Sequence, residues 1–154
     1  MNIFVLDLDH EKNAQYHVDK HCSKMIVEYA QMLSTAVRLS GVDAGYKISH
    51  RNHPCTRWVG ESRENWLWLR DLLDALNTEW KYRYNHERNH KSFDVAMSLP
   101  IPKLPSVGLT PFAQAMPEYC KCNNAVRAYR RYYRWEKNHI ASWKNRKKPR
   151  FFRN

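Results

Sequence analysis

Apolar side chains recur at helical spacing over two long stretches of the chain. In residues 11–40 the spacing alternates between four and three positions, and the series is Val18, Cys22, Met25, Tyr29, Met32 and Ala36. A second series begins at His53-Pro54 and runs to about Tyr84, with Trp58, Ser62, Trp66, Leu69, Leu73, Leu76 and Trp80. Because an α-helix has 3.6 residues per turn, each series lies along one helix face. We therefore expect two long helices packed antiparallel, the second of them bent.

Shorter segments complete the predicted fold. Residues 3–8 are apolar enough for one strand or for an extended segment packed on helices, and residues 86–97 have room for a further helical turn. Five of the seven prolines fall within residues 98–117, which predicts an irregular loop. A last helix is expected from about Cys122 to Trp143. The pattern predicts a mostly α fold, a compact bundle of about three main helices with a long Pro-rich loop and little or no sheet.

Length and composition limit the class of protein. A chain of 154 residues suits a single domain over residues 1–154, since about 150 residues bury roughly two thirds of their unfolded surface. At 43% hydrophobic residues the chain is too apolar for intrinsic disorder, and no apolar run approaches the roughly 18 residues of a membrane span. The cysteines lack the spacing of a zinc knuckle, and we expect reduced thiols and a cytoplasmic location. They are Cys22, Cys55, Cys120 and Cys122.

Positive charge is concentrated at the C-terminus. Residues 1–120 carry 14 basic and 14 acidic side chains, which cancel, whereas residues 121–154 carry 12 basic side chains against one acid, Glu136. The whole net charge of +11 therefore lies in a basic C-terminal helix and tail. Such an asymmetry indicates a polyanionic partner, either nucleic acid or an anionic membrane surface.

The C-terminal segment also alternates its cations with aromatic side chains, in the order Arg-Ala-Tyr-Arg-Arg-Tyr-Tyr-Arg-Trp-Glu-Lys over residues 127–137. Cations can hold phosphates while Tyr or Trp stacks on an unpaired base. We expect a nucleic acid, with the choice between DNA and RNA left open by this segment, and no membrane, because the helix has few branched aliphatic residues. A solvated basic face whose tyrosines belong to the core is compatible with the same partner. The predicted phosphate ligands are Arg127, Arg130, Arg131 and Arg134.

A line of polar residues borders the apolar stripe of the first helix. These are His17, His21, Lys24, Glu28 and Gln31. Partly buried groups at such a border are candidates for general acid/base catalysis, here by His17, His21 or Glu28, and Lys24 offers an amine. The alternative is an ordinary solvated flank in which Lys24 and Glu28 form an i,i+4 ion pair.

Two histidine pairs have the i,i+4 spacing that can present two imidazoles to one metal ion. They are His17/His21 and His86/His90. The second pair lies in residues 85–92, a segment polar enough to favour a solvated helix end, so we expect no metal and no cofactor.

The entry to the second helix concentrates functional side chains. Arg51, Asn52, His53 and Arg57 lie around Pro54, where free backbone N–H groups and two arginines favour a phosphate. Simple capping by Asn52 or His53 is the alternative.

These motifs resemble a known family. The first helix reads Lys24-Met-Ile-Val-Glu28-Tyr-Ala-Gln31-Met-Leu33, and Asn52-His53-Pro54 with Arg57-Trp58 opens a second helix that reaches Glu79-Trp80-Lys-Tyr-Arg83-Tyr. Over about residues 1–85 this resembles small bacterial and phage proteins grouped with the pyrimidine-dimer DNA glycosylases, the endonuclease V-like superfamily.

The resemblance implies a helical enzyme that flips a damaged nucleotide from duplex DNA. In that family the α-amine of the processed N-terminus attacks the sugar C1′ to give a Schiff base, a glutamate in the first helix assists, and β-elimination nicks the backbone. This chain departs from the pattern at two positions. An ungapped match places Lys24 where the family has its glutamate, with Glu28 one turn further on. Methionine is normally retained before asparagine, so Asn2 is not expected to become the free terminus.

We therefore predict a base-excision glycosylase/AP lyase that acts on a damaged or modified DNA base, in a bacterial cell or a phage-infected host. Its nucleophile would be Lys24 or the N-terminal amine. One alternative is a nucleic-acid-binding protein without catalysis. A metal-dependent hydrolase built on the histidine pairs is the other. The lesion and the oligomeric state are not specified by the sequence.

Overall fold

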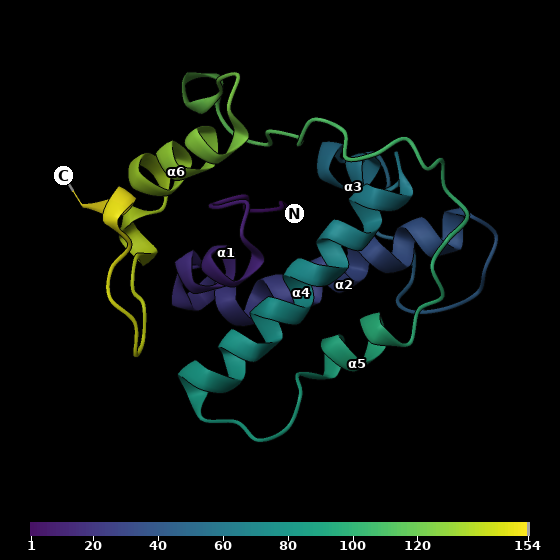
Figure 1. Ribbon diagram of the computed structural model, residues 1–154, viewed down its shortest axis with the longest axis horizontal. Coiled ribbons are helices and arrows are strands. Elements are labelled where there is room, and N and C mark those ends of the chain that lie inside the picture. Colours follow the sequence, from purple (N-terminus) through teal and green to yellow (C-terminus); the bar gives the residue numbers. More distant parts are fainter. Residues whose placement is uncertain (154) are drawn as a thin grey trace.

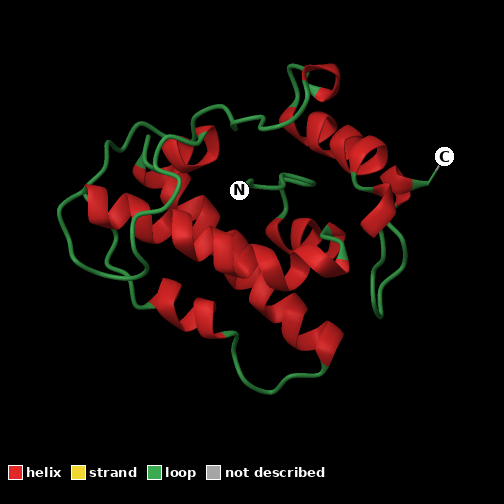
Figure 2. Ribbon diagram, turned by 180° about the vertical axis from the view of Figure 1, so that it is seen from behind, coloured by secondary structure: helices red, strands yellow, loops and turns green. Residues whose placement is uncertain are grey.

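The protein is described by a computed structural model that covers residues 1–153. Helices connected by loops make up this part of the chain, and it contains no strand (Figures 1 and 2). The α-helices are α1 (His10–Tyr16), α2 (Asp19–Leu39), α3 (Pro54–Val59), α4 (Arg63–Tyr84), α5 (Lys91–Met97) and α6 (Ala125–Glu136). Single 3-10 turns occur at η1 (Glu118–Cys120), η2 (Asn138–Ile140) and η3 (Arg150–Phe152). The predicted mostly α fold is confirmed.

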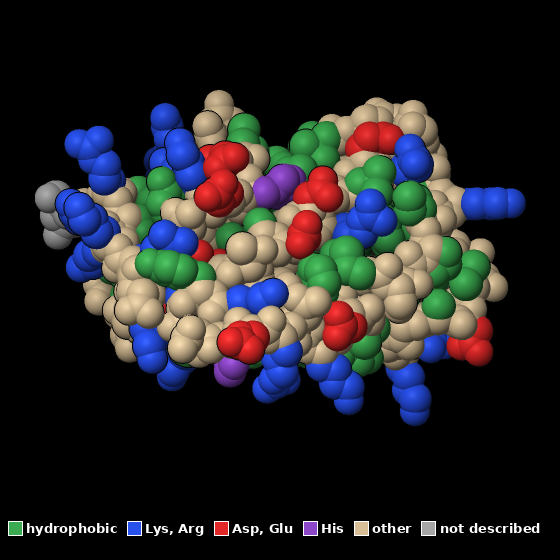
Figure 3. All heavy atoms as spheres, turned by 60° about the horizontal axis from the view of Figure 1, so that its bottom comes forward, with side chains coloured by type: hydrophobic (Ala, Val, Ile, Leu, Met, Phe, Trp, Pro, Cys, Tyr) green, Lys and Arg blue, Asp and Glu red, His purple; other side chains and the backbone are tan. Residues whose placement is uncertain are grey.

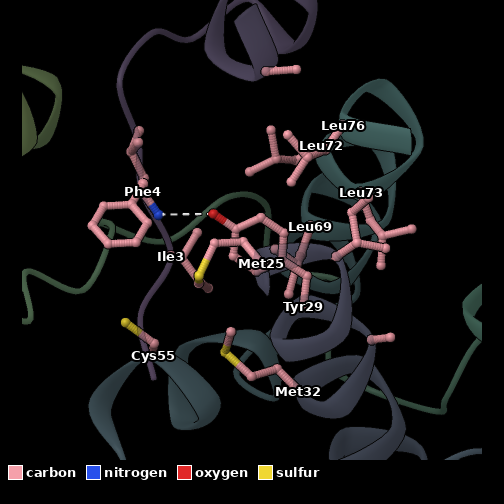
Figure 4. Packing of buried hydrophobic residues seen from close by; sticks show 14 of the residues in the cluster. Ile3, Phe4, Met25, Tyr29, Met32, Cys55, Leu69, Leu72, Leu73 and Leu76 are labelled. Carbon is pink, nitrogen blue, oxygen red and sulfur yellow. Dashed lines mark hydrogen bonds between the residues drawn. The ribbon is translucent and has the colours of Figure 1, made fainter. Parts of the chain in front are cut away.

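The two long helices, α2 and α4, pack antiparallel as the apolar stripes predict. Asp19 at the start of α2 pairs with Arg83 near the end of α4, with 3.0 Å between Oδ1 and Nη1. At the other end, the Trp66 indole N–H of α4 donates to the Leu33 carbonyl of α2, at 3.1 Å. The leucines of α4 and the methionines of α2 belong to one core cluster, in which Met25 points toward the N-terminal segment and Met32 toward Cys55 (Figure 4). The shorter helices α3 and α5 both pack against α2.

The prediction of one helix over residues 11–40 is wrong at its start, because α1 ends at Tyr16 and His17 and Val18 are extended. Distant parts of the chain satisfy the N–H groups at this break. The Val18 N–H donates to the Tyr133 hydroxyl, and the Asp19 N–H donates to the Ser142 carbonyl. A contact with residues more than 110 positions away cannot be read from local spacing.

The second predicted helix is broken rather than bent. Helix α3 ends before Gly60, and α4 begins after Ser62, whose hydroxyl accepts from the Asn65 N–H as an N-cap. The Arg63 N–H donates to the Pro105 carbonyl of the Pro-rich loop. This loop, residues 98–117, runs over α3 and the start of α4 (Figure 1). Hydrogen bonds between Asn65 and Thr110 hold it there.

The C-terminal region is part of the same packing. Helix α6 is shorter than the predicted segment, because Asn124 caps it and it ends at Glu136. In the tail that follows, Trp143 and Phe152 are buried with the main core. The Arg146 guanidinium binds both carboxylate oxygens of Glu79 on α4. The predicted basic tail is therefore fastened to the body by apolar and ionic contacts.

The surface carries basic side chains in two arrangements. On the face shown in Figure 3, acidic side chains lie between the basic ones in the middle of the molecule, whereas basic side chains crowd the end that holds α6 and the tail. Within residues 1–153 no helix is long and apolar enough to cross a membrane. Cys22, Cys55 and Cys120 are buried free thiols, and Cys122 is partly exposed.

Candidate active site

The first six residues form an extended segment that side chains, rather than a neighbouring strand, hold in place. The Phe4 N–H donates to the Tyr29 hydroxyl at 3.1 Å, the dashed contact in Figure 4, and the Leu6 N–H donates to Asn13 Oδ1 at 3.0 Å. The Leu6 carbonyl accepts from Arg130 Nε at 2.8 Å. Ile3, Phe4, Val5 and Leu6 are all buried. Because buried backbone groups must be paired, these side chains fix the position of the segment.

Asn2 anchors the beginning of this segment. Its Oδ1 lies 2.8 Å from the Tyr129 hydroxyl of α6 and also accepts from the Ile3 N–H. Its Nδ2 donates to the Ala115 carbonyl at 2.8 Å, and the residue is buried. Both the oxygen and the nitrogen of the Asn2 side chain therefore form hydrogen bonds inside the protein.

The anchored segment brings the N-terminal amine to Glu28. The ammonium nitrogen of Met1 lies 3.2 Å from Glu28 Oε1. The Met1 side chain is only 3% exposed, whereas Met1 as a whole is partly exposed, so its accessible part is the main-chain end that carries the amine. Glu28 itself is 13% exposed. The pair thus combines an accessible amine with a largely buried carboxylate.

Lys24 lies one helical turn before Glu28, and its Nζ is 3.8 Å from Glu28 Oε2, which is the i,i+4 ion pair considered from the sequence. The Lys24 side chain is 69% exposed. Glu28 Oε2 is buried and makes no hydrogen bond to any residue in the range 1–153. One carboxylate oxygen therefore holds the α-amine, and the other has a free lone pair beside an exposed cation.

His53 faces the same amine from α3. Its Nδ1 accepts the Cys55 N–H at 3.1 Å, which makes it the N-cap of this helix. Burial lowers the pKa of His53, the nearby N-terminal ammonium lowers it further, and Glu28 acts in the opposite direction. The neighbouring Asn52 and Arg57 are exposed, with 3.4 Å between Asn52 Oδ1 and Arg57 Nη2. The site therefore has a carboxylate, two amines and an imidazole, with an arginine one turn away.

A comparison with protein families agrees with this arrangement. A family model described as pyrimidine dimer DNA glycosylase matches residues 1–92, which is 92 of the 154 residues. The chain belongs to the pyrimidine dimer DNA glycosylase family. No curated protein and no solved structure matches it.

Membership of the glycosylase family confirms the predicted resemblance and implies DNA as the substrate. The matched region contains Met1, Lys24, Glu28, His53 and Arg57. The Pro-rich loop and α6 lie outside the match, yet they supply the Ala115 carbonyl and the Tyr129 hydroxyl that anchor Asn2. A region outside the family match therefore supports the site within it.

The two histidines predicted as catalytic candidates lie in the core of this glycosylase-family chain. His17 is fully buried between the Asn13 carbonyl, 2.7 Å from Nδ1, and the Tyr29 hydroxyl, 2.9 Å from Nε2. His21 is 5% exposed, stacks on Phe4 and bonds the Tyr133 hydroxyl through Nδ1. Burial lowers the pKa of each imidazole to about 3. Through their contacts with Tyr29, Tyr133 and Phe4, the two histidines support the extended segment that positions the amine.

The histidine pairs do not form a metal site. Within residues 1–153 no three His, Cys, Asp or Glu side chains group closely enough to hold a metal ion. His86 stacks on Trp80, with 4.1 Å between ring centroids, and His90 caps α5. Among the described residues, the histidine pairs therefore lack the further ligands that a metal-dependent hydrolase would need.

The C-terminal arginines lie at a second location. Arg127, Arg130 and Arg134 line a cavity of about 530 Å³ that also contains Asp7 and Phe151. Arg130 is engaged internally, since it binds the Leu6 carbonyl and Asp7 Oδ2. Arg131 lies over the Trp135 ring, 5.9 Å from its centroid.

The extended segment links the two locations, because Met1 is at the amine site and Asp7 lines the arginine cavity. Six extended residues span about 20 Å. Of the four residues around Pro54, His53 lies near the amine, whereas Arg51 and Arg57 line a separate cavity with Thr56 and Lys103. The α6 arginines lie apart from the amine as well.

Sequence reasoning named the N-terminal amine as an alternative to Lys24 but missed the residues that position it. Asn2 and Tyr129 are 127 positions apart, and their contact depends on α6 packing against the N-terminal segment. A polar residue directly before four apolar ones was the single local signal.

Proposed function

We propose that the protein is a DNA glycosylase with AP-lyase activity in which the α-amine of Met1 is the nucleophile and Glu28 handles its proton. The observation that supports this proposal is the contact of 3.2 Å between the α-amine and the largely buried Glu28 carboxylate, inside the region that matches the glycosylase family. A carboxylate at this distance can accept a proton from the ammonium, and only the free amine is nucleophilic.

The reaction begins when the free amine attacks C1′ of the damaged nucleotide. The N–C1′ bond forms, the bond between C1′ and the base breaks, and the base leaves with the electron pair and takes up a proton. Opening of the sugar ring transfers a proton from nitrogen to O4′ and gives an imine. Removal of a C2′ proton then forms a C=C bond and breaks the C3′–O bond, which nicks the strand. Glu28 is the only carboxylate in contact with the amine among residues 1–153, and we assign it the proton transfers.

The α-amine is favoured over Lys24 as the nucleophile because it is held more firmly. Met1 directly precedes the anchored Asn2, and its own side chain is buried. The Lys24 side chain is 69% exposed and makes one contact of 3.8 Å. Since orientation of the reacting groups supplies much of the rate enhancement, the fixed amine is the better nucleophile. Lys24 as nucleophile is the competing prediction.

DNA would lie across both clusters of cations. Asn52 and His53 would lie next to the reacting nucleotide, and Arg51 and Arg57 would hold the backbone further along the strand. The α6 arginines would contact it about 20 Å away along the extended segment, a distance of about six base pairs. Trp135, which is 51% exposed, is available for stacking on an unpaired base.

Trapping with borohydride tests the proposal. A duplex with a thymine dimer is incubated with the protein and sodium borohydride, which reduces an imine to a stable cross-link. We expect a covalent adduct with the native protein. We expect a decrease of about 10²-fold or more in its rate of formation for Glu28→Gln, which keeps the shape but removes the proton acceptor. His86→Gln, a change remote from the amine, is the matched control. The absence of an adduct with both dimer-containing and abasic DNA would contradict an amine nucleophile.

A further inference from the structure

A second pocket lies two helical turns along α2 from Glu28. The end of α2, helix α3 and the Pro-rich loop enclose a cavity of about 380 Å³. We call it the Lys103 pocket and define it by Arg51, Arg57, Lys103, Thr56, Leu39 and Leu104. Lys103 and Leu104 belong to the loop, outside the 92 residues that match the family. One wall of the pocket therefore lies outside the region that matches the family.

Three cations converge on this pocket without a carboxylate to neutralise them. The lining residues include no Asp or Glu. None of the ion pairs formed within residues 1–153 involves Arg51, Arg57 or Lys103. All three side chains are exposed, and Leu39 and Leu104 supply apolar surface beside them. An apolar wall lowers the local dielectric and strengthens the attraction of the cations for an anion.

The Thr56 hydroxyl is an independent sign of a ligand. Thr56 lines the pocket and is only 4% exposed, yet its Oγ1 has no hydrogen-bond partner among residues 1–153. A buried hydroxyl without a partner destabilises the folded protein, so such a group is usually satisfied by something that binds. A hydroxyl donor with three cations matches the oxygens of a phosphate.

We propose that the Lys103 pocket binds a phosphoryl group, held by Arg51, Arg57 and Lys103 and accepting a hydrogen bond from Thr56. The cavity also has room for the sugar to which the phosphate is attached. Glu28 and Ala36, which borders the pocket, are eight residues apart on α2, or about 12 Å. A DNA strand advances by 3.4 Å per nucleotide, so the pocket would take a phosphate three to four nucleotides from the reacting sugar.

Titration with inorganic phosphate tests the site directly. Two-dimensional NMR of the ¹⁵N-labelled protein is expected to give saturable shifts of the Thr56 and Lys103 amide signals. Lys103→Ala should weaken the phosphate affinity about tenfold, because a charge-assisted contact is lost. Lys12→Ala, which removes an exposed cation on α1, is the matched control and should leave the affinity unchanged.

Thr56→Val separates a ligand role from a structural one. Valine keeps the shape of threonine and removes a hydroxyl that makes no hydrogen bond within the described chain. We expect weaker phosphate binding together with a thermal midpoint that is unchanged or raised. A lowered midpoint with unaltered phosphate affinity would give the hydroxyl a structural role and overturn its assignment.

An undamaged duplex identifies the source of the phosphate, and this arm rests on the proposed function. A plot of log affinity against log salt should be shallower for Lys103→Ala by about 0.9, the value for one phosphate contact. If Lys103→Ala weakens the binding of inorganic phosphate but leaves the salt slope for DNA unchanged, the pocket is supported and its ligand is a free phosphate-bearing molecule. Absence of both effects overturns the proposal. Because no chemistry occurs on undamaged DNA, a failure here is distinct from a failure of borohydride trapping.

Discussion

At the scale of single residues, the two oxygens of Glu28 have different surroundings. Oε1 is paired with the α-amine, while Oε2 is buried, without a hydrogen bond in residues 1–153, and 3.8 Å from the Lys24 ammonium. The i,i+4 spacing of Lys24 and Glu28 was evident in the sequence. The contact with the amine was not, because it depends on where the extended segment ends.

Tyr129→Phe tests whether the anchor of Asn2 positions the amine. The change removes a hydroxyl that contacts Asn2 Oδ1, the Ala113 carbonyl and the Ala115 N–H. We expect the free energy of unfolding to fall by about 1–3 kcal/mol and kcat to fall more than KM changes, since the amine loses its fixed position. Denaturant unfolding and steady-state kinetics on dimer DNA measure these effects.

Tyr132→Phe on the same helix is the matched control, because no hydrogen bond of the Tyr132 hydroxyl is present in the described chain. Equal losses of kcat in the two variants would show that the ring packing of α6, rather than the anchor, matters for turnover.

At the scale of elements, the apolar spacing predicted the two long helices but not their breaks. The gap between α1 and α2 depends on Tyr133 and Ser142, and the gap before α4 depends on Pro105. Each of these partners is distant in sequence. The histidines beside the first gap looked like a polar flank, because the partner of His21 is Tyr133 on α6 and because His17 lies outside the helix that carries its own partner, Tyr29.

The buried histidines at this gap make the protein sensitive to acid. In the folded protein the pKa of His17 and of His21 is lowered to about 3, whereas in the unfolded chain both titrate near 6.5. The unfolded state therefore binds more protons below pH 6.5, and stability falls as the pH falls through this value. Between pH 7.5 and 5.5 we expect each histidine to lower the free energy of unfolding by about 1.4 kcal/mol.

Urea unfolding at the two pH values measures this change. His21→Leu should make the pH dependence shallower by about half of the combined effect, whatever its stability at pH 7.5. An identical pH dependence in the variant would show that His21 is not buried in its neutral form.

Helix α6 contains arginines of two kinds. Arg127 is exposed, while Arg130 binds the Leu6 carbonyl and Asp7. We expect Arg127→Ala to make the salt dependence of DNA affinity shallower by about 0.9 and to leave the thermal midpoint unchanged. Arg130→Ala should lower the midpoint by several degrees, because it leaves a buried carbonyl without its donor. Fluorescence anisotropy and thermal melts test the pair, and the reverse assignment of effects would contradict this division of roles.

At the scale of the whole molecule, the distribution of charge has a different meaning from the one that the sequence suggested. The basic C-terminal segment contains Tyr129, Tyr133 and Trp143, which are buried, and it supplies the anchor for the N-terminal segment. The family match ends at residue 92, so more than a third of the chain lies outside it and packs against the matched region. The alternation of cations and aromatics predicted a binding surface, and the alternative considered from the sequence, a basic face whose Tyr129, Tyr133 and Trp143 belong to the core, is confirmed for these three side chains.

The identity of the nucleophile is the central claim, and peptide mapping of the trapped adduct tests it most directly. The protein is cross-linked to dimer-containing DNA with borohydride, digested with nuclease and protease, and analysed by tandem mass spectrometry. We predict that the sugar remnant is attached to the α-amine of a peptide that begins with Met1. Attachment to Lys24, or to an amine at residue 2 after loss of Met1, would contradict the account.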